Sequence, residues 1–213
     1  MPRFREHYSI LPPVIKFLLI SNVIVYVLEM SYPDAFFSYF ALWPITTEPV
    51  SLYGQAYPEF MPWQLISYAF LHGSFTHIFF NMYALWLFGI NLENLWGSRN
   101  FATYYIVCVA GAAITQLIVQ DLSGEYSPTI GASGGVFGVL LAFGLFFPNQ
   151  RLLLLIPPMP IKAKWFVLIY GVVELAFGVT GSNTGVAHFA HLGGMLFGFL
   201  MIGYWMRNPP TGR

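Results

Sequence analysis

Charged residues are scarce in this sequence. Asp, Glu, Lys and Arg make up only 8% of its 213 residues, and hydrophobic residues make up 57%. About a quarter of the residues in a typical soluble domain are charged, so this composition excludes an ordinary soluble domain. With a mean hydropathy of +0.64, the chain is predicted to be a polytopic membrane protein.

Cysteine is almost absent as well. Cys108 is the only one in the chain, so an intramolecular disulfide is excluded. Because Cys108 falls within an apolar run, we expect a buried and inert thiol.

Long apolar runs are what the sequence does have. A helix needs roughly 17 to 20 mostly apolar residues to cross a hydrocarbon core of ~30 Å. Six runs of this kind cover residues 14–30, 77–96, 101–120, 130–147, 165–180 and 188–206. The fold class that they predict is an all-α membrane protein, with six transmembrane helices in a single membrane domain over residues 1–213.

Positive charges are missing from one side of this arrangement. All nine Lys and Arg residues lie around the two ends of the chain or in the second and fourth connections. Because Lys and Arg are retained in the cytoplasm, both termini are predicted to be cytoplasmic. The charged residues of the outer connections are all acids. The longest outer connection, residues 31–61, is rich in aromatic residues and Pro, and we expect it to fold back against the membrane.

Two reactive side chains lie in glycine-rich spans. Ser133 follows Gly131-Ala132 at the outer start of the fourth span, and His191 lies in the first turn of the sixth. Both spans run inward, which places the two side chains at similar depth. Serine needs a neighbouring base to lose its proton. Each helix carries a small-xxx-small pair that permits close approach, namely Gly134 with Gly138 and Gly194 with Gly198.

The fourth span is short. From Ile130 to Phe147, before Pro148, it covers roughly 27 Å, a little less than the hydrocarbon thickness. Ser133 is therefore expected a few Å inside the membrane, where the exposed N–H groups of a helix N-terminus favour developing negative charge. His77 and Asn81, four residues apart in the second span, share a helical face at a similar depth and could donate to an oxyanion.

These motifs resemble those of the rhomboid intramembrane serine proteases over nearly the whole chain. They are His72-x4-His77-x3-Asn81, Gly131-Ala132-Ser133-Gly134, His191-x2-Gly194-x3-Gly198 and Glu93-x3-Gly97-Ser98. The resemblance implies that Ser133 is the nucleophile and His191 the general base and acid. It also implies an oxyanion hole made of His77, Asn81 and the Ser133 backbone N–H.

The resemblance implies supporting roles too. His72 matches a histidine that supports the first loop, and Phe137 falls where an aromatic ring packs on the catalytic imidazole. The first loop has Trp63-Gln64 where the family has Trp-Arg, which puts the family's hydrogen bonds in that loop in question. Glu93 is too far from Ser133 to join it and is expected to anchor the following turn.

The implied function is intramembrane serine endopeptidase activity through a Ser-His dyad with no acidic third member. The implied substrate is a transmembrane helix, cut near its outer end after local unwinding. We expect transmembrane proteins and membrane lipid as partners, no nucleic acid, no cofactor and no metal, in a bacterial cytoplasmic membrane. The glycine-rich connection 181–185 is expected to cap the site.

Other interpretations remain open. A catalytically silent relative that escorts transmembrane helices would generally lack Ser133 or His191, and a transporter would be expected to show inverted repeats. A metal site at His72, His77 and His191 would have no Cys and no close carboxylate. Two further polar residues are given structural explanations: Glu174, in the fifth span, is expected to make a protonated structural hydrogen bond, and His188 to be interfacial or to support a loop.

Overall fold

A computed structural model of the chain describes residues 8–45, 51–52, 55–56, 58–153, 159–180 and 187–210. Within these residues, five helices are long and apolar enough to cross a membrane, and a sixth apolar helix is shorter. They are α1 (Pro13–Ser31), α4 (Phe75–Trp96), α5 (Ser98–Ser123), α7 (Ala163–Thr180), α8 (His188–Arg207) and the shorter α6 (Ser133–Phe146). The expected six-helix membrane fold is confirmed.

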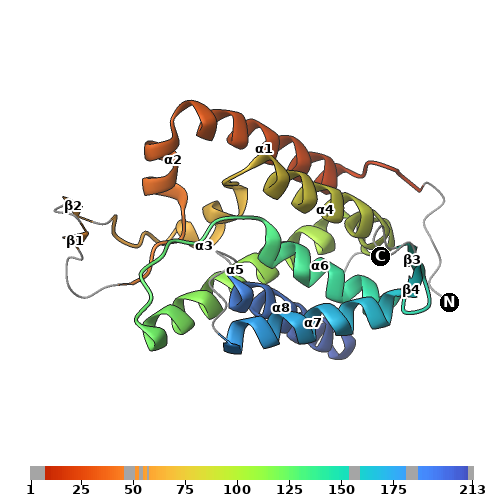
Figure 1. Cartoon of the computed structure of the whole chain (residues 1–213). Helices are drawn as coiled ribbons and strands as arrows, with labels where there is room; N and C mark the ends of the chain where they lie inside the picture. The colour runs from red at the N-terminus through yellow and green to blue at the C-terminus, as the bar shows by residue number, and fades with distance from the viewer. Residues whose placement is uncertain are drawn as a thin grey trace.

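The short helix α6 lies at the centre of the bundle. It packs against α4, α5, α7 and α8, while α1 packs against α4. The start of α1 and the β3–β4 hairpin lie at one end of the bundle, and α2 lies at the other (Figure 1). Helix α6 begins deeper in the bundle than the point where α5 ends (Figure 1). A functional group on its first turn is therefore recessed.

Two small hairpins are additions to the predicted all-helical fold. They are formed by the antiparallel pairs β1 (Ser51–Leu52) with β2 (Gln55–Ala56), and β3 (Arg151–Leu153) with β4 (Pro160–Lys162). Both lie in connections, so they leave the helical bundle unchanged.

The boundaries of α6 differ from the prediction. The helix begins at Ser133 rather than Ile130 and ends at Phe146 rather than Phe147. The preceding segment is held by backbone hydrogen bonds to other parts of the chain. Thr129 and Leu42 exchange two such bonds of 2.9 Å, and the Gly131 N–H donates to Tyr68 O at 2.9 Å. These bonds place the catalytic candidate at the first position of the helix.

Helix α5 is longer than the apolar run that predicted it. It begins at Ser98 instead of Phe101 and continues to Ser123 instead of Gln120. Hydropathy marks the apolar part of a helix, whereas the hydrogen-bonded helix continues through polar residues at either end. Gly97, with φ +80°, makes the turn from α4 in a conformation that glycine adopts readily.

Glycines bring α6 and α8 into backbone contact, as predicted from the two small-xxx-small pairs. A Cβ at Gly194 would overlap the carbonyl oxygen of Gly134, and a Cβ at Gly138 would lie 3.0 Å from Gly194 O. Gly198 instead packs on α5, where a Cβ would overlap the Tyr104 hydroxyl. Only glycine at these positions permits so close an approach of the helices.

The first loop folds back onto the bundle in its described part. It contains α2 (Pro33–Phe40), α3 (Gln64–Ser67) and the 3₁₀ turn η1 (Tyr68–Phe70), and Trp43 and Leu42 are buried. Gln64 is fully buried and accepts from the backbone N–H groups of Trp43 and Met61, both at 3.2 Å. Its amide donates to Tyr39 O at 3.3 Å. Gln64 therefore links the loop internally at the position where the family has Arg.

Glu93 anchors the turn after α4, as expected, and also caps α1. Its carboxylate accepts from Ser98 Oγ at 2.7 Å and from the backbone N–H groups of Val14 and Ile15, each at 2.9 Å. The first N–H groups of a helix have no partner within the helix, so a buried carboxylate there stabilises the start of α1.

Candidate active site

Ser133 and His191 form a hydrogen-bonded pair between α6 and α8. Ser133 Oγ lies 2.8 Å from His191 Nε2. His191 is 7% exposed and Ser133 is half-buried, so the pair is shielded but open on one side. A hydroxyl next to an imidazole nitrogen can lose its proton to that nitrogen as it attacks.

Phe137, one turn after Ser133, fixes the plane of the imidazole. Its ring stacks on that of His191 with centroids 4.2 Å apart and planes inclined by 6°. Tyr170 of α7 also packs against Phe137, with ring centroids 6.1 Å apart. The predicted contact of Phe137 with the imidazole is therefore present.

Gly131 brings His77 to the same place. Its φ is +117°, which disfavours any side chain. A Cβ at Gly131 would lie 2.7 Å from His77 Nε2 and 3.7 Å from Ser133 Oγ. The imidazole of His77 and the hydroxyl of Ser133 thus flank the same glycine.

Asn81 lies one turn further along α4 and is turned toward its own helix. Its Nδ2 donates to His77 O at 3.0 Å, which leaves its second N–H for another acceptor. Both His77 and Asn81 line a cleft of about 840 Å³. The structure therefore places the two expected oxyanion donors on one cleft wall, and His77 flanks Gly131 beside Ser133.

The cleft lies between α4 and α7, with α6 as its floor. Its walls are mostly aromatic and aliphatic side chains, including Phe80 and Leu87 of α4, Phe137 and Leu140 of α6, and Phe166 and Tyr170 of α7. Several of these side chains are also exposed on the outer surface of the bundle. An apolar segment could therefore reach the neighbourhood of Ser133 from the side of the bundle.

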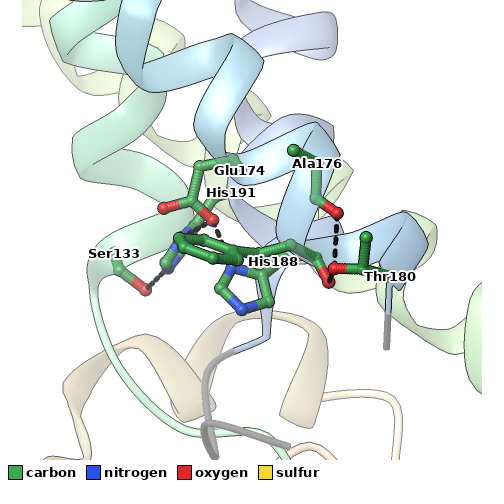
Figure 2. Close-up of polar contacts among 7 residues, drawn as sticks. Ser133, Glu174, Ala176, Thr180, His188 and His191 are labelled. Carbon is green, nitrogen blue, oxygen red and sulfur yellow. Dashed lines mark hydrogen bonds and ion pairs between the residues drawn. The ribbon is translucent and has the colours of Figure 1, made fainter. Parts of the chain in front are cut away.

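Glu174 of α7 is the residue that the sequence interpretation missed. Its Oε2 lies 2.7 Å from His188 Nδ1, in a hydrogen bond, and 3.0 Å from His191 Nδ1. The contact with His191 is short, but its angle is not that of a hydrogen bond. Figure 2 shows the carboxylate between the two imidazoles and Ser133 beyond His191. The structure therefore places a carboxylate beside the pair, where the sequence interpretation had no acidic third member.

The structural hydrogen bond expected of Glu174 is present, and its partner is His188. His188, expected to be interfacial or to support a loop, is 8% exposed and bonds to this carboxylate. The partners of Glu174 lie on the next helix, outside its own span. The positions of the residues along their helices indicate this pairing. Glu174 lies six residues before the end of α7, and His188 and His191 lie in the first turn of α8.

The three side chains also form a group that could hold a metal ion. One ligand atom from each of Glu174, His188 and His191 lies within 4.8 Å of the others. This group shares only His191 with the three histidines considered in the sequence, since His72 and His77 are not part of it. The carboxylate and the imidazoles of the group already contact one another at 2.7 and 3.0 Å.

His72, expected to support the first loop, lies at the edge of this site. Its backbone N–H donates to Glu29 Oε2 at 2.9 Å, and its ring packs edge-on to His77 with centroids 4.9 Å apart. Burial, assisted by the neighbouring His77, lowers the pKa of His72 to about 4. The ring is therefore neutral at physiological pH.

Comparison with known proteins settles the family. The Rhomboid domain matches residues 59–208. The chain belongs to the rhomboid family. This confirms the resemblance inferred from the motifs, and the fold is that of a multi-pass membrane protein.

Individual relatives are similar over the same region. This rhomboid is 35% identical over 138 residues to Rhomboid protein 1, mitochondrial, of Saccharomyces cerevisiae, covering 64% of this chain and 40% of the yeast protein. It is 32% identical over 152 residues to Presenilin-associated rhomboid-like protein, mitochondrial, of Bos taurus, covering 66% and 39%. It is 33% identical over 137 residues to Rhomboid protease GluP of Bacillus subtilis, covering 64% and 25%. The matched region is less than half the length of each relative.

The expected cap at residues 181–185 lies outside the described residues. His188 and Thr180, which flank it, are described.

Proposed function

We propose that this rhomboid is an intramembrane serine endopeptidase in which Ser133 is the nucleophile and His191 the general base and acid. The observation that carries the proposal is the 2.8 Å contact between Ser133 Oγ and His191 Nε2 at the recessed start of α6. Membership of the rhomboid family and the similarity to a relative named as a protease support it.

The reaction follows from the positions of these groups. Ser133 Oγ attacks the scissile carbonyl carbon while its proton passes to His191 Nε2. His77, the Asn81 amide and the Ser133 backbone N–H donate to the resulting oxyanion. The proton then passes from His191 to the leaving amine, and the acyl-enzyme forms. Water gives a proton to His191 and attacks the ester carbonyl. His191 then returns that proton to Ser133 Oγ as the ester bond breaks, which releases the acid product and restores Ser133.

The substrate that fits the cleft is a transmembrane helix. The space between α4 and α7 is lined by apolar and aromatic side chains, which suits a segment arriving from lipid. A helix hides its carbonyls in its own hydrogen bonds, so it must unwind before attack. Substrates with Gly or Pro near the cut are therefore favoured, and the resemblance to the family adds a small residue before the cut.

We propose cleavage near the outer membrane face, with both termini in the cytoplasm of a bacterial cell. The basic residues Lys16, Arg99 and Lys164 begin α1, α5 and α7, and Arg207 ends α8. Such a basic end faces the cytoplasm, and Ser133 lies toward the opposite end. Cysteines introduced singly at Lys164 and Glu125 test this orientation: an impermeant thiol reagent should label only the second in intact cells.

The experiment that tests the activity uses a fluorophosphonate probe on the full chain purified in detergent. The expected result is covalent labelling, mapped to Ser133, together with cleavage of a reporter protein carrying one transmembrane helix. Ser133→Ala should lose both. Ser21→Ala, which removes another half-buried helical serine, should lose neither. Cleavage by Ser133→Ala would overturn the proposed nucleophile.

The base is tested in the same assays. His191→Ala should abolish labelling and cleavage while the protein stays inserted and folded. If His191→Ala retained activity and His188→Ala lost it, the base would be His188. The mechanism uses no cofactor or metal, so a chelator should leave the rate unchanged; loss of activity that zinc restores would contradict this.

A further inference from the structure

We propose that Glu174 is a positioning residue for the catalytic imidazole, held in place by His188, so that the site is a connected series Ser133–His191–Glu174–His188. This inference rests on the proposed function. It goes beyond it because a serine–histidine pair alone requires no carboxylate.

A carboxylate at this position needs a specific reason. Glu174 is the only acidic residue in α7, its only other charged residue being Lys164 in the first turn, and it is 8% exposed. An ionisable group within a transmembrane helix is costly unless it is paired. Here the same oxygen, Oε2, meets two ring nitrogens, at 2.7 and 3.0 Å.

The two histidines reach Glu174 because of their spacing on α8. His188 and His191 are three residues apart in the first turn, so they project from one helical face. Their rings are nearly perpendicular, with centroids 6.5 Å apart. Both present Nδ1 to the carboxylate, which leaves His191 Nε2 directed to Ser133 (Figure 2).

The direction of these nitrogens determines where the proton must be. To accept the Ser133 proton, Nε2 of His191 must be free of hydrogen, so the neutral ring must carry its proton on Nδ1. Glu174 Oε2 is the group that lies 3.0 Å from that nitrogen. A carboxylate there favours the productive tautomer and stabilises the imidazolium that forms during attack. Modest rotation of the imidazole would align the N–H with the oxygen as the ring gains charge.

His188 has a different task. Its hydrogen bond of 2.7 Å fixes Oε2 from the side away from Ser133. Phe137 restrains the plane of His191 from its face. The carboxylate and the imidazole are thus each restrained by a second contact.

Other groups near His191 define the electrostatic setting. The titratable side chains around it are His77 of α4, Glu174 of α7 and His188 of α8. Helix α6 contributes the Ser133 hydroxyl, and α5 meets this part of α8 with small residues, Ala112 and Thr115 against Gly193. Among the described residues that face His191, Glu174 is therefore the negative group.

The test is Glu174→Gln in the full-length protein, compared with Glu125→Gln at an exposed loop position. Glu174→Gln should lower kcat by roughly 10² to 10⁴-fold, the range set by loss of an orienting carboxylate. KM should change little, because Glu174 does not touch the substrate. The acid limb of the pH–rate profile should shift to lower pH, since the imidazolium loses its negative neighbour. Glu125→Gln should behave as the wild type.

If Glu174 and His188 only held α7 and α8 together, the result would be different. Glu174→Gln and His188→Asn would then be equally harmful because both lower thermal stability, and the acid limb of the pH–rate profile would not shift. That outcome would overturn the proposal. The proposal would also be overturned if Glu174→Gln kept the wild-type kcat and acid limb while Ser133→Ala was inactive. Cleavage by Ser133→Ala would instead overturn the proposed function itself.

A second measurement uses the wild-type protein, so it does not depend on a Glu174 variant that folds. In the wild-type protein labelled with ¹⁵N-histidine, the signals of His191 are identified by their loss in His191→Asn. The proposal requires a protonated Nδ1 and an unprotonated Nε2 at neutral pH. Finding the proton on Nε2 would overturn it.

Discussion

Phe137 and His191 lie face to face, with ring centroids 4.2 Å apart and planes inclined by only 6°. Phe137 is on α6, one turn after Ser133, so the same helix that carries the nucleophile also restrains the base. The edge of the imidazole, with its two nitrogens, is left free to contact Ser133 on one side and Glu174 on the other.

Removing this ring should slow the reaction without removing any reacting group. Phe137→Ala is expected to lower kcat by roughly 10 to 100-fold, because an imidazole displaced by about 1 Å loses its alignment. Steady-state cleavage of the reporter substrate measures the change. Leu145→Ala on the outer surface of α6 is the control and should be near the wild type. An equal loss in both variants would indicate general damage to α6.

The oxyanion donors give a graded prediction. His77→Ala or Asn81→Ala is expected to lower the rate by roughly 10 to 1,000-fold, because one donor of several is lost and the Ser133 backbone N–H remains. His77→Ala should have the larger effect, since His77 flanks Gly131 beside Ser133, whereas Asn81 donates to a backbone carbonyl. Single-turnover kinetics would measure both, and full activity in the double variant would remove the oxyanion role.

Much of this architecture could be predicted from the sequence because it depends on local patterns. Apolar length marks the spans, and glycine spacing marks the close contact of α6 with α8. The depth of Ser133 and His191 follows from the direction of their helices. Each of these features is a property of one helix or of two helices whose order is known.

The rest depends on contacts between segments that no local pattern specifies. Glu174 looked unpaired because its partners, His188 and His191, are on the next helix. The start of α6 is fixed by backbone hydrogen bonds of Thr129 with Leu42 and of the Gly131 N–H to Tyr68 O, both far away in sequence. Gln64 makes loop contacts of its own at the position of the family's Arg. These features depend on tertiary hydrogen bonds, which hydropathy and motifs do not predict.

The contact between α6 and α8 makes a prediction about stability. A Cβ at Gly194 would overlap Gly134 O, so Gly194→Ala must push the helices apart and should cost about 1 to 3 kcal/mol or more. Gly203→Ala on the same helix is the matched control, because nothing lies within 4 Å of its added Cβ. It should be neutral or stabilise the helix by about 0.5 to 1 kcal/mol. Thermal unfolding in detergent compares them; equal midpoints would show that the contact is not close in solution.

The last prediction concerns the acid sensitivity of the first loop. The pKa of His72 is lowered from 6.5 to about 4, first by burial and then by the neighbouring His77. The unfolded chain therefore binds a proton at His72 between these pH values and the folded chain does not, so stability falls as the pH drops from 6.5 toward 4. The cost at pH 5 is about 2 kcal/mol.

His72→Asn removes this titration while keeping a polar side chain next to Phe70 O. Its backbone N–H can still donate to Glu29. The wild type should therefore lose more thermal stability than His72→Asn between pH 7.5 and pH 5. The difference isolates His72, because His77, His188 and His191 are present in both proteins. Parallel losses in the two proteins would mean that His72 is protonated without cost, and that the acid sensitivity belongs to other histidines.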